Sequence, residues 1–357
     1  MRDASSSAAG SEPAAGACAA LDPAEAERLV AGAAESARRI REAVGRVLVG
    51  QQEVLDQTLV AWMAAGHVLL EGLPGLGKTL LVKTLARVTD LTYSRIQFTP
   101  DLMPADIVGT QVLVQDPAGG ARTFRFQPGP IFAQVVLADE INRATPKTQS
   151  ALLECMQEHR VTVAGEEHVL EEPFFVLATQ NPIEMEGTYP LPEAQLDRFL
   201  FKVKVPYPSR EELARIVDRT TGVDVPSVEP VIGRKEILSI QRAVRMVALS
   251  RSMLEVVLAL TEATHPHESS LEMVRRYVRY GASPRGAQSL VMAAKARALL
   301  LGRMHVTPED LEQVLLPSWR HRIVLSFQGE SEGVDPDDIL RAVWRESAAQ
   351  EVGRGAG

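Results

Sequence analysis

The sequence predicts an α/β domain built on a parallel sheet, followed by a smaller helical domain. Between residues 47 and 205 short apolar runs alternate with helical patterns, and the runs are too continuous for half-exposed strands. Beyond residue 205 the strand signals stop and helix start signals follow, such as the capping box of Ser209 and Glu212. A chain of 357 residues also has the length for about two domains.

The elements are assigned in order along the chain. Residues 1–21 are rich in Ala and Ser without an apolar period, so we expect a disordered tail. Asp22 is the expected cap of a first helix, with Pro23 at its first position and Glu25 reaching back. The expected strands are 68–71, 95–98, 135–138, 174–179 and 201–205. The expected domains are the α/β domain at 22–206, the helical domain at 207–345 and a flexible tail at 346–357.

Composition and charge narrow the function classes. The two cysteines, Cys18 and Cys155, are too few for a disulfide framework, which indicates a reducing compartment. No apolar run approaches the roughly 20 residues that cross a bilayer, and the first residues lack a secretion signal. We therefore expect a cytoplasmic protein without membrane insertion. The net charge of −8 argues against a protein that coats nucleic acid.

A glycine-rich segment after the first expected strand predicts a phosphate-binding loop. Residues 72–79 fit the pattern G-x-x-x-x-G-K-[ST] and lie between a strand and a helical run, as this motif requires. The glycines let backbone N–H groups point at phosphate oxygens, and the helix N-terminus adds partial positive charge. Lys78 is expected to reach the β and γ phosphates of ATP, and the Thr79 hydroxyl to bind Mg²⁺. The predicted nucleotide-binding residues are Gly72, Leu73, Pro74, Gly75, Leu76, Gly77, Lys78, Thr79 and Leu80.

Two carboxylates stand at the end of the third expected strand. Asp139 follows the buried run 135–138, and Glu140 follows Asp139. An aspartate in this place can hold Mg²⁺, and an adjacent glutamate can deprotonate an attacking water. An acidic strand end exposed to solvent is the structural alternative. The order of the two motifs favours ATP hydrolysis, with ATP and Mg²⁺ as ligands.

Several longer stretches resemble the MoxR family of AAA+ ATPases. They are 71–79, 138–144, 178–182, 187–199 and 281–286. The resemblance runs from about residue 40 to about residue 344 and implies a P-loop NTPase (AAA+) domain with a C-terminal all-α lid domain. It also implies an ATP-hydrolysing chaperone that forms a homo-oligomeric ring, expected to be hexameric. The implied clients are proteins with von Willebrand factor A domains.

The resemblance assigns roles to further residues. Asn181 matches sensor 1, where a polar side chain holds the attacking water, although Asn-Pro also opens turns. Arg198 matches the arginine finger, which reaches the γ-phosphate in a neighbouring subunit, and a surface arginine is the alternative. Arg285 matches sensor 2 on the lid, which contacts the nucleotide from the far side. Val49 and Gly50 resemble the segment that lines the adenine, although Gly50 could simply end a helix.

Two insertions resemble those of one branch of the superfamily. Residues 107–131 hold two extended pieces around a strong turn signal at 116–120, like an insert that points toward the ring pore or the substrate. Residues 160–170 alternate as a hairpin, with Glu166 and Glu167 expected at its tip. Related helicases carry a basic residue at that tip, so the acidic residues argue against nucleic acid as a partner.

Other function classes stay open on the sequence alone. The ATPase subunit of a metal chelatase is a near relative of the leading class. A DNA translocase is disfavoured by the net charge, and a nucleotide switch without turnover is disfavoured by the intact catalytic positions. His265 and His267 have metal-like residue types, but a solvated loop is favoured. Cys155 is expected to be a small buried residue of a helix.

Overall fold

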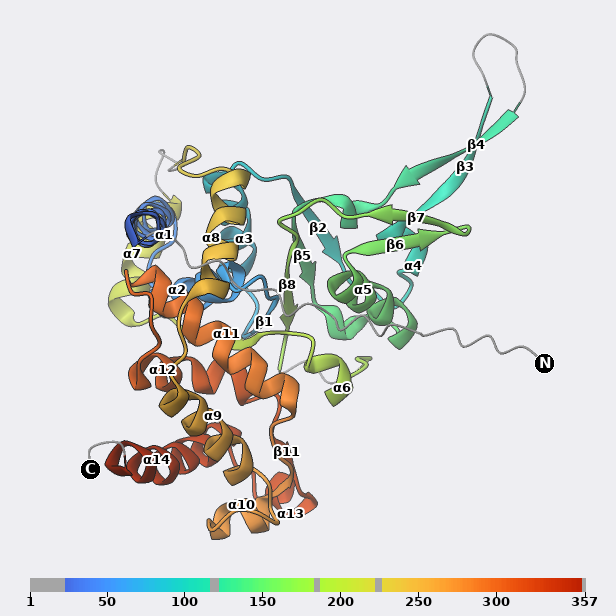
Figure 1. Cartoon of the computed structure of the whole chain (residues 1–357). Helices are drawn as coiled ribbons and strands as arrows, with labels where there is room; N and C mark the ends of the chain where they lie inside the picture. The colour runs from blue at the N-terminus through green and yellow to red at the C-terminus, as the bar shows by residue number, and fades with distance from the viewer. Residues whose placement is uncertain (1–22, 116–121, 183–186, 222–226, 355–357) are drawn as a thin grey trace, which may run out of the picture.

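A five-stranded parallel sheet forms the centre of the first domain (Figure 1). The structure is a computed structural model and describes residues 23–115, 122–182, 187–221 and 227–354. The strands follow the order β2-β5-β8-β1-β9 across the sheet. Their bounds are β1 Val68–Glu71, β2 Tyr93–Gln97, β5 Val135–Asp139, β8 Phe175–Gln180 and β9 Phe201–Lys204. The strands predicted from the sequence are therefore confirmed, with small shifts at their ends.

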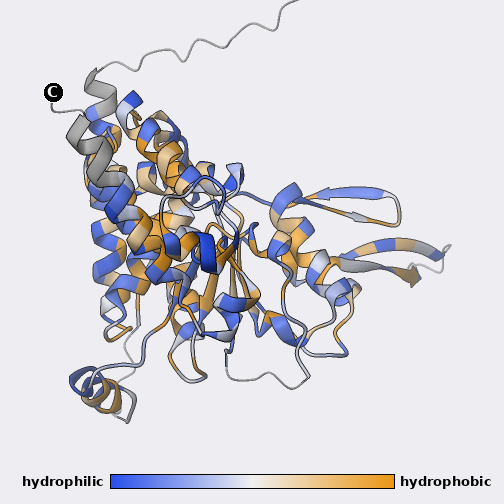
Figure 2. Cartoon of the chain, turned by 90° about the horizontal axis from the view of Figure 1, so that it is seen from below, coloured by the Kyte–Doolittle hydropathy of each residue, from blue (hydrophilic) through white to orange (hydrophobic). Residues whose placement is uncertain are grey.

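Both faces of the sheet are buried, because successive side chains of a strand point to opposite sides. On β1, Val68 and Leu70 pack into the cluster that includes the first three helices, whereas Leu69 packs into the cluster that includes α5. Apolar residues accordingly gather between the sheet and its helices (Figure 2). The helices are α1 Pro23–Gly45, α2 Gln52–Met63, α3 Lys78–Val88 and α5 Pro146–Glu158. The expected cap Asp22 and the tail before it lie outside the described residues.

The second domain is built around α11 and shares a core with the first. Buried residues of its helices belong to the same hydrophobic cluster as those of α1 and α2. Its helices are α8 Arg234–Met246, α9 Arg251–Ala263, α10 Glu272–Tyr277, α11 Pro284–Leu300, α12 Pro308–Trp319, α13 Phe327–Ser331 and α14 Pro336–Arg354. The expectation of a purely helical domain needs one correction, because β10 Val278–Tyr280 pairs antiparallel with β11 Val324–Leu325. Strands this short carry too few residues for a periodic signal.

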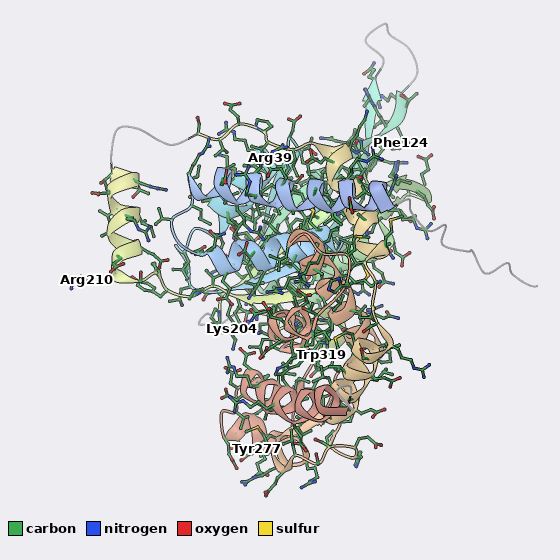
Figure 3. The ribbon with its side chains drawn as sticks, turned by 60° about the vertical axis from the view of Figure 1, so that its left-hand side comes forward. Arg39, Phe124, Lys204, Arg210, Tyr277 and Trp319 are labelled. Atoms are coloured by element: carbon green, nitrogen blue, oxygen red, sulfur yellow. The ribbon has the colours of Figure 1, made fainter. Side chains whose placement is uncertain are left out.

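Two helices lie at the margins of the second domain. The helix α7 Arg210–Thr221 begins at the predicted capping box of Ser209 and Glu212 and lies apart from the other helices of this domain (Figure 3). Its Arg219 donates to the carbonyl oxygen of Arg46, just after α1, at 3.1 Å. At the other end α14 runs to Arg354, so a helix continues where a flexible tail from residue 346 was expected. None of the described helices is both long enough and apolar enough to cross a membrane.

Two β-hairpins project from the first domain on the same side (Figure 1). One pairs β3 Gly109–Gln115 with β4 Arg122–Pro128, and the other pairs β6 Arg160–Val163 with β7 Glu166–Val169. The rings of Phe126 and His168 stack with 3.8 Å between centroids and so join the two hairpins. The turn predicted at 116–120 lies outside the described residues.

The tip of the β6–β7 hairpin differs from the prediction. Ala164 and Gly165 form its two-residue turn, with φ of 51° and 89°. A short turn of this kind needs positive φ at both positions, which glycine adopts at no steric cost. Glu166 and Glu167 therefore begin β7, and Glu167 lies 3.4 Å from the guanidinium of Arg160. The acidic residues follow the tip and do not form it.

Candidate active site

The loop between β1 and α3 borders an open cavity of about 440 Å³. Gly75 and Gly77 have φ of 80° and 76°, a conformation that side chains other than glycine rarely adopt. A Cβ at Gly75 would meet no atom within 4 Å, so the loop leaves open space for a ligand. The first N–H groups of α3 lack partners within the helix and give this end partial positive charge. The cavity is lined by residues 74–80 with Arg95, Asp139, Glu140 and Asn181.

Lys78 is held against its own loop. Its Nζ donates to the carbonyl oxygen of Gly72 at 2.6 Å. Burial lowers the pKa of Lys78, and the negative charges of Asp139 and Glu140 oppose this effect. The ammonium group lies at the cavity wall. Phosphate oxygens are stronger acceptors than a carbonyl, so a bound phosphate could take the place of the Gly72 carbonyl oxygen. Gly72 and Leu73 complete the loop without lining the cavity.

Thr179 of β8 holds the carboxylate of Asp139 and the backbone of Glu140. Glu140 follows Asp139 in a left-handed backbone conformation with φ of 57°, a strain that costs roughly 1–3 kcal/mol in general. The buried Thr179 hydroxyl accepts from the N–H of Glu140 at 2.8 Å and donates to the carboxylate of Asp139 at 2.6 Å. One side chain thus stabilises the strained backbone and fixes the direction of the Asp139 carboxylate.

We expect Thr179→Val to lower kcat for ATP hydrolysis about 10-fold or more, because Asp139 is an expected Mg²⁺ ligand and residues that hold a metal ligand in place typically have effects of that size. Valine keeps the shape of threonine but provides neither of the two hydrogen bonds. Thr179→Ser keeps a hydroxyl and serves as the matched control, with most activity retained. Steady-state phosphate release measures both variants. A wild-type kcat for Thr179→Val would show that Thr179 does not orient the carboxylates.

Three further polar side chains contact these carboxylates, two from β2 and one, Arg143, from the stretch that follows β5. Arg95 Nη2 donates to Asp139 at 2.7 Å, and Gln97 Nε2 donates to Glu140 at 2.9 Å. Arg143 Nη1 donates to the same oxygen of Glu140, also at 2.9 Å. Gln97 lies directly opposite Asp139 in the register of β2 and β5. Polar residues at the end of an apolar strand were visible in the sequence, but only the strand order shows which carboxylates they face.

The donor set suits a nucleoside triphosphate with bound Mg²⁺. Thr79 and Asp139 both line the cavity and offer oxygen atoms, which Mg²⁺ prefers in combination with phosphate oxygens. Lys78 and Arg95 supply positive charge on the same wall. Across the residues that the structure describes, no three His, Cys, Asp or Glu side chains gather into an all-protein metal site. A Mg²⁺ ion bound by Thr79 and Asp139 would leave further coordination positions for phosphate oxygens.

Val49 and Gly50 lie next to the phosphate loop but do not line this cavity. The adjacent Gln51 donates from Nε2 to the carbonyl oxygen of Leu76 at 2.7 Å, which ties the segment to the loop. Gly50 has φ of 70°, and a Cβ there would come within 2.3 Å of the Glu212 carboxylate of α7. The positive φ favours glycine here, and a larger residue would also displace the Glu212 side chain. The segment therefore connects the phosphate loop to α7.

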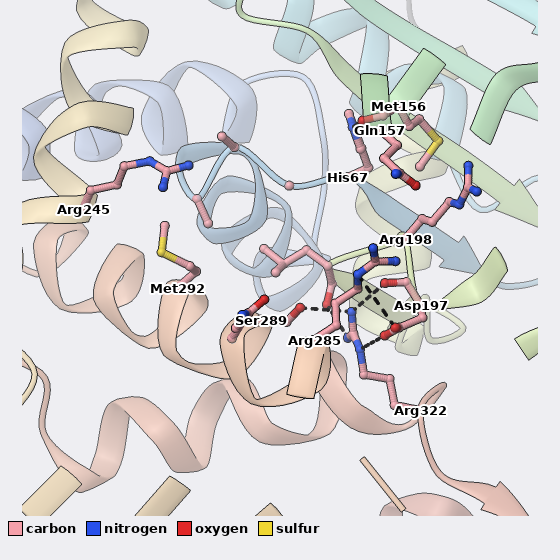
Figure 4. A pocket seen from close by; sticks show the side chains of 15 residues that line it. His67, Met156, Gln157, Asp197, Arg198, Arg245, Arg285, Ser289, Met292 and Arg322 are labelled. Carbon is pink, nitrogen blue, oxygen red and sulfur yellow. Dashed lines mark hydrogen bonds and ion pairs between the residues drawn. The ribbon is translucent and has the colours of Figure 1, made fainter. Parts of the chain in front are cut away.

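Arg198 and Arg285 line a second cavity, of about 290 Å³, that shares no lining residue with the first (Figure 4). Arg198 follows the short helix α6 Glu193–Leu196, and Arg285 lies in the first turn of α11. Arg285, the expected sensor 2 residue, does not line the phosphate cavity of its own chain. The start of α11 packs beside Asp197, with Arg285 Nε 4.0 Å from that carboxylate, so the lid arginine is grouped with Arg198.

The weaker candidates have structural explanations. Cys155 is buried in α5, and burial raises the pKa of its thiol to about 12, which confirms it as a packed residue. The ring of His265 lies with Nε2 3.2 Å from the carbonyl oxygen of Ala282. The other cysteine, Cys18, lies outside the described residues.

A parallel sheet with a phosphate loop after β1, two carboxylates at the end of β5 and a helical lid defines an ATPase of the P-loop class. Residues 67–201 match the ATPase family associated with various cellular activities (AAA), and residues 271–343 match the AAA lid domain. The chain is 43% identical over 331 residues to Chaperone MoxR1 of Mycobacterium tuberculosis, across 92% of this chain and 86% of that one.

Two further comparisons point to the same family of proteins. The uncharacterized protein YeaC of Bacillus subtilis is 44% identical over 305 residues, across 85% of this chain and 91% of that one. The crystal structure of an ATPase candidate from Cytophaga hutchinsonii has a TM-score of 0.84 at 40% identity and covers 90% of this chain and 97% of its own. The chain therefore belongs to the MoxR family of AAA+ ATPases, which confirms the resemblance and the fold class found in the sequence.

Proposed function

We propose that the chain hydrolyses ATP with Mg²⁺ and uses the energy to remodel client proteins. The observation that carries this proposal is the convergence of Lys78, Thr79, Asp139 and Glu140 on one open cavity. A phosphate cradle, metal ligands and a base are the parts that transfer of a phosphoryl group to water requires.

Each side chain has a separate task in this reaction. Lys78 binds the β and γ phosphates, while Thr79 and Asp139 hold Mg²⁺, which spreads the phosphate charge when bound. Glu140 Oε2 accepts a proton from water as the water oxygen attacks the γ phosphorus. The bond from phosphorus to the bridging oxygen breaks, and ADP and phosphate result. Asn181 lines the same cavity, which supports a role in orienting the water.

Arg198 and Arg285 are proposed to act on the nucleotide of a neighbouring subunit. Their cavity is separate from the phosphate cavity of their own chain, which supports action on another copy. Head-to-tail contacts that close into a ring place one face of each subunit against a different face of the next. A homo-oligomeric ring, expected to be hexameric, would thus pair the arginine cavity of one subunit with the phosphate cavity of its neighbour.

The β3–β4 hairpin is proposed to bind the client. Phe124 is 71% exposed and Leu113 is 51% exposed, and the two residues lie opposite each other in the hairpin register. Large apolar side chains exposed together on a projecting element are typical of protein interaction sites. One relative is named a chaperone, which supports a protein client, and the family resemblance favours clients with von Willebrand factor A domains. The net charge of −8 disfavours a nucleic acid.

We expect Leu113→Ser combined with Phe124→Ser to abolish client capture while basal ATP hydrolysis stays unchanged, because the hairpin lies outside the phosphate cavity. The measurement is a pull-down of a purified von Willebrand factor A domain protein, in ATP and with Glu140→Gln to prevent turnover. Val169→Ser is the matched control, since Val169 is 78% exposed on the other hairpin. Equal recovery of the client with the Leu113→Ser/Phe124→Ser variant and with the Val169→Ser control would refute the β3–β4 surface as the binding element. Recovery of nucleic acid in place of protein would favour a translocase.

A further inference from the structure

We propose that Arg322 of the lid is a positioning residue that sets Arg198 and Arg285 as one unit for hydrolysis in the neighbouring subunit. The proposal rests on the shared site described above and adds a residue that no motif singled out. Arg322 follows α12 and lines the arginine cavity (Figure 4). Its side chain is only 2% exposed, so it does not reach a neighbouring subunit itself.

All three nitrogen atoms of the Arg322 guanidinium donate hydrogen bonds. Nε donates to the Asp197 carboxylate at 2.6 Å. Nη2 donates to the carbonyl oxygens of Asp197 at 3.1 Å and Phe199 at 2.8 Å, and to the Ser289 hydroxyl at 3.1 Å. Nη1 donates to the carbonyl oxygen of Leu200 at 3.2 Å and to that of Ser318. A buried arginine whose donors are all occupied fixes the groups that it contacts.

Two of these contacts go to the residues on either side of Arg198 in the chain. Arg322 holds the carbonyl oxygens of Asp197 and Phe199, the residues immediately before and after Arg198. The neighbouring His321 strengthens the attachment, with Nε2 3.0 Å from the carbonyl oxygen of Phe199. The backbone direction at Arg198 is therefore set by the lid, although Arg198 itself belongs to the first domain.

The same guanidinium also fixes the helix that carries Arg285. Ser289 lies one turn after Arg285 on α11 and accepts from Arg322. Asp197, held by Arg322 through one carboxylate oxygen, accepts from Ser283 at 3.4 Å through the other. Ser283 is the cap residue of α11. Arg322 therefore connects the loop of Arg198 to the first turns of α11 and so fixes the position of the two cavity arginines relative to each other.

Arg322→Lys is expected to lower kcat at least about 10-fold with little change in KM, because small misplacements of a reacting group commonly cost up to about 10²-fold. Lysine keeps the positive charge but lacks the planar fork that binds several oxygens at once. Asp197→Asn is the second variant, which keeps the size of the side chain and removes its charge, and we expect the same loss. Binding of ATP should be unchanged in both, since neither residue lines the phosphate cavity.

A mixing experiment separates positioning in the neighbour's site from a structural role. Lys78→Ala subunits have intact arginines but do not bind ATP, whereas Arg322→Lys subunits bind ATP but have displaced arginines. Neither should hydrolyse ATP well alone. In a random ring formed from an equal mixture, about a quarter of neighbouring pairs combine the ATP site of an Arg322→Lys subunit with the arginines of a Lys78→Ala subunit. The mixture should therefore hydrolyse ATP faster than either variant alone. Arg198→Ala mixed with Lys78→Ala is the reference for the shared site.

Arg303→Lys is the control for loss of the planar fork at another lid arginine, one that is half-buried. Arg303 binds both carboxylate oxygens of Asp310, at 2.6 and 2.7 Å, but does not line the arginine cavity. It should lower the melting temperature without the loss of kcat. A wild-type kcat for Arg322→Lys and Asp197→Asn would overturn the proposal. It would also be overturned if mixing with Lys78→Ala restored the activity of Arg198→Ala but not that of Arg322→Lys. Failure to restore Arg198→Ala would overturn the shared site itself, and the role of Arg322 with it.

Discussion

Glu140→Gln is expected to lower kcat for ATP hydrolysis by roughly 10²- to 10⁴-fold while ATP affinity stays near the wild-type value. The amide cannot accept the proton of the attacking water. Its carbonyl oxygen can still accept from Gln97 and Arg143, which donate to Glu140 Oε2 at 2.9 Å each, so the side chain keeps its orientation. The loss is therefore one of basicity and not of shape, and the ATP-bound assembly should accumulate.

Calorimetry for ATP binding and single-turnover phosphate release test this expectation together. Lys78→Ala is the contrasting variant, because removing the ammonium group leaves phosphate repulsion uncompensated and should abolish binding. Glu140→Gln should bind and not turn over, whereas Lys78→Ala should do neither. Hydrolysis near the wild-type rate in Glu140→Gln would exclude Glu140 as the base. Wild-type ATP affinity in Lys78→Ala would show that the phosphate loop has been assigned incorrectly.

The parts of the site that are local in sequence were predictable from the sequence. Residues 72–77 form one continuous loop that leads into α3 at Lys78, and Gly75 and Gly77 have left-handed φ values, which glycine adopts readily. Asp139 ends the buried strand β5 and Glu140 follows it, so their place at the carboxyl end of the parallel strands follows from the sequence order. The alternation of apolar runs and helical patterns predicted the five strands for the same reason, because each signal lies within one element.

The parts that depend on packing between distant segments were not predictable. Arg95 and Gln97 face the carboxylates only because β2 and β5 are neighbours in the sheet. The order of strands cannot be predicted from a local sequence pattern. Arg285 lies with Arg198 because the start of α11 packs against Asp197, a contact across the two domains. The hairpin tip was misplaced for a smaller reason: the alternation left the register open, and the two-residue turn at Ala164 and Gly165 set it.

Arg198→Ala is expected to bind ATP normally and to lose hydrolysis by on the order of 10³-fold or more, as for arginine fingers in other phosphoryl-transfer enzymes. The phosphate cavity of the same chain is untouched, because Arg198 does not line it. The fold should also be preserved, since the contacts that Arg322 makes on either side of Arg198 go to backbone carbonyl oxygens and to Asp197. A loss confined to kcat is the expected signature.

The dependence on protein concentration tests whether Arg198 acts in a neighbouring subunit. Specific activity of the wild type should rise with concentration as rings assemble, because a complete site needs two copies. Arg198→Ala should assemble over the same range and stay inactive. Arg251→Ala is the control, since the Arg251 side chain is 91% exposed on the lid surface and should behave as the wild type. A rate independent of concentration, measured on a demonstrated monomer, would reject the shared site and leave Arg198 as a surface arginine.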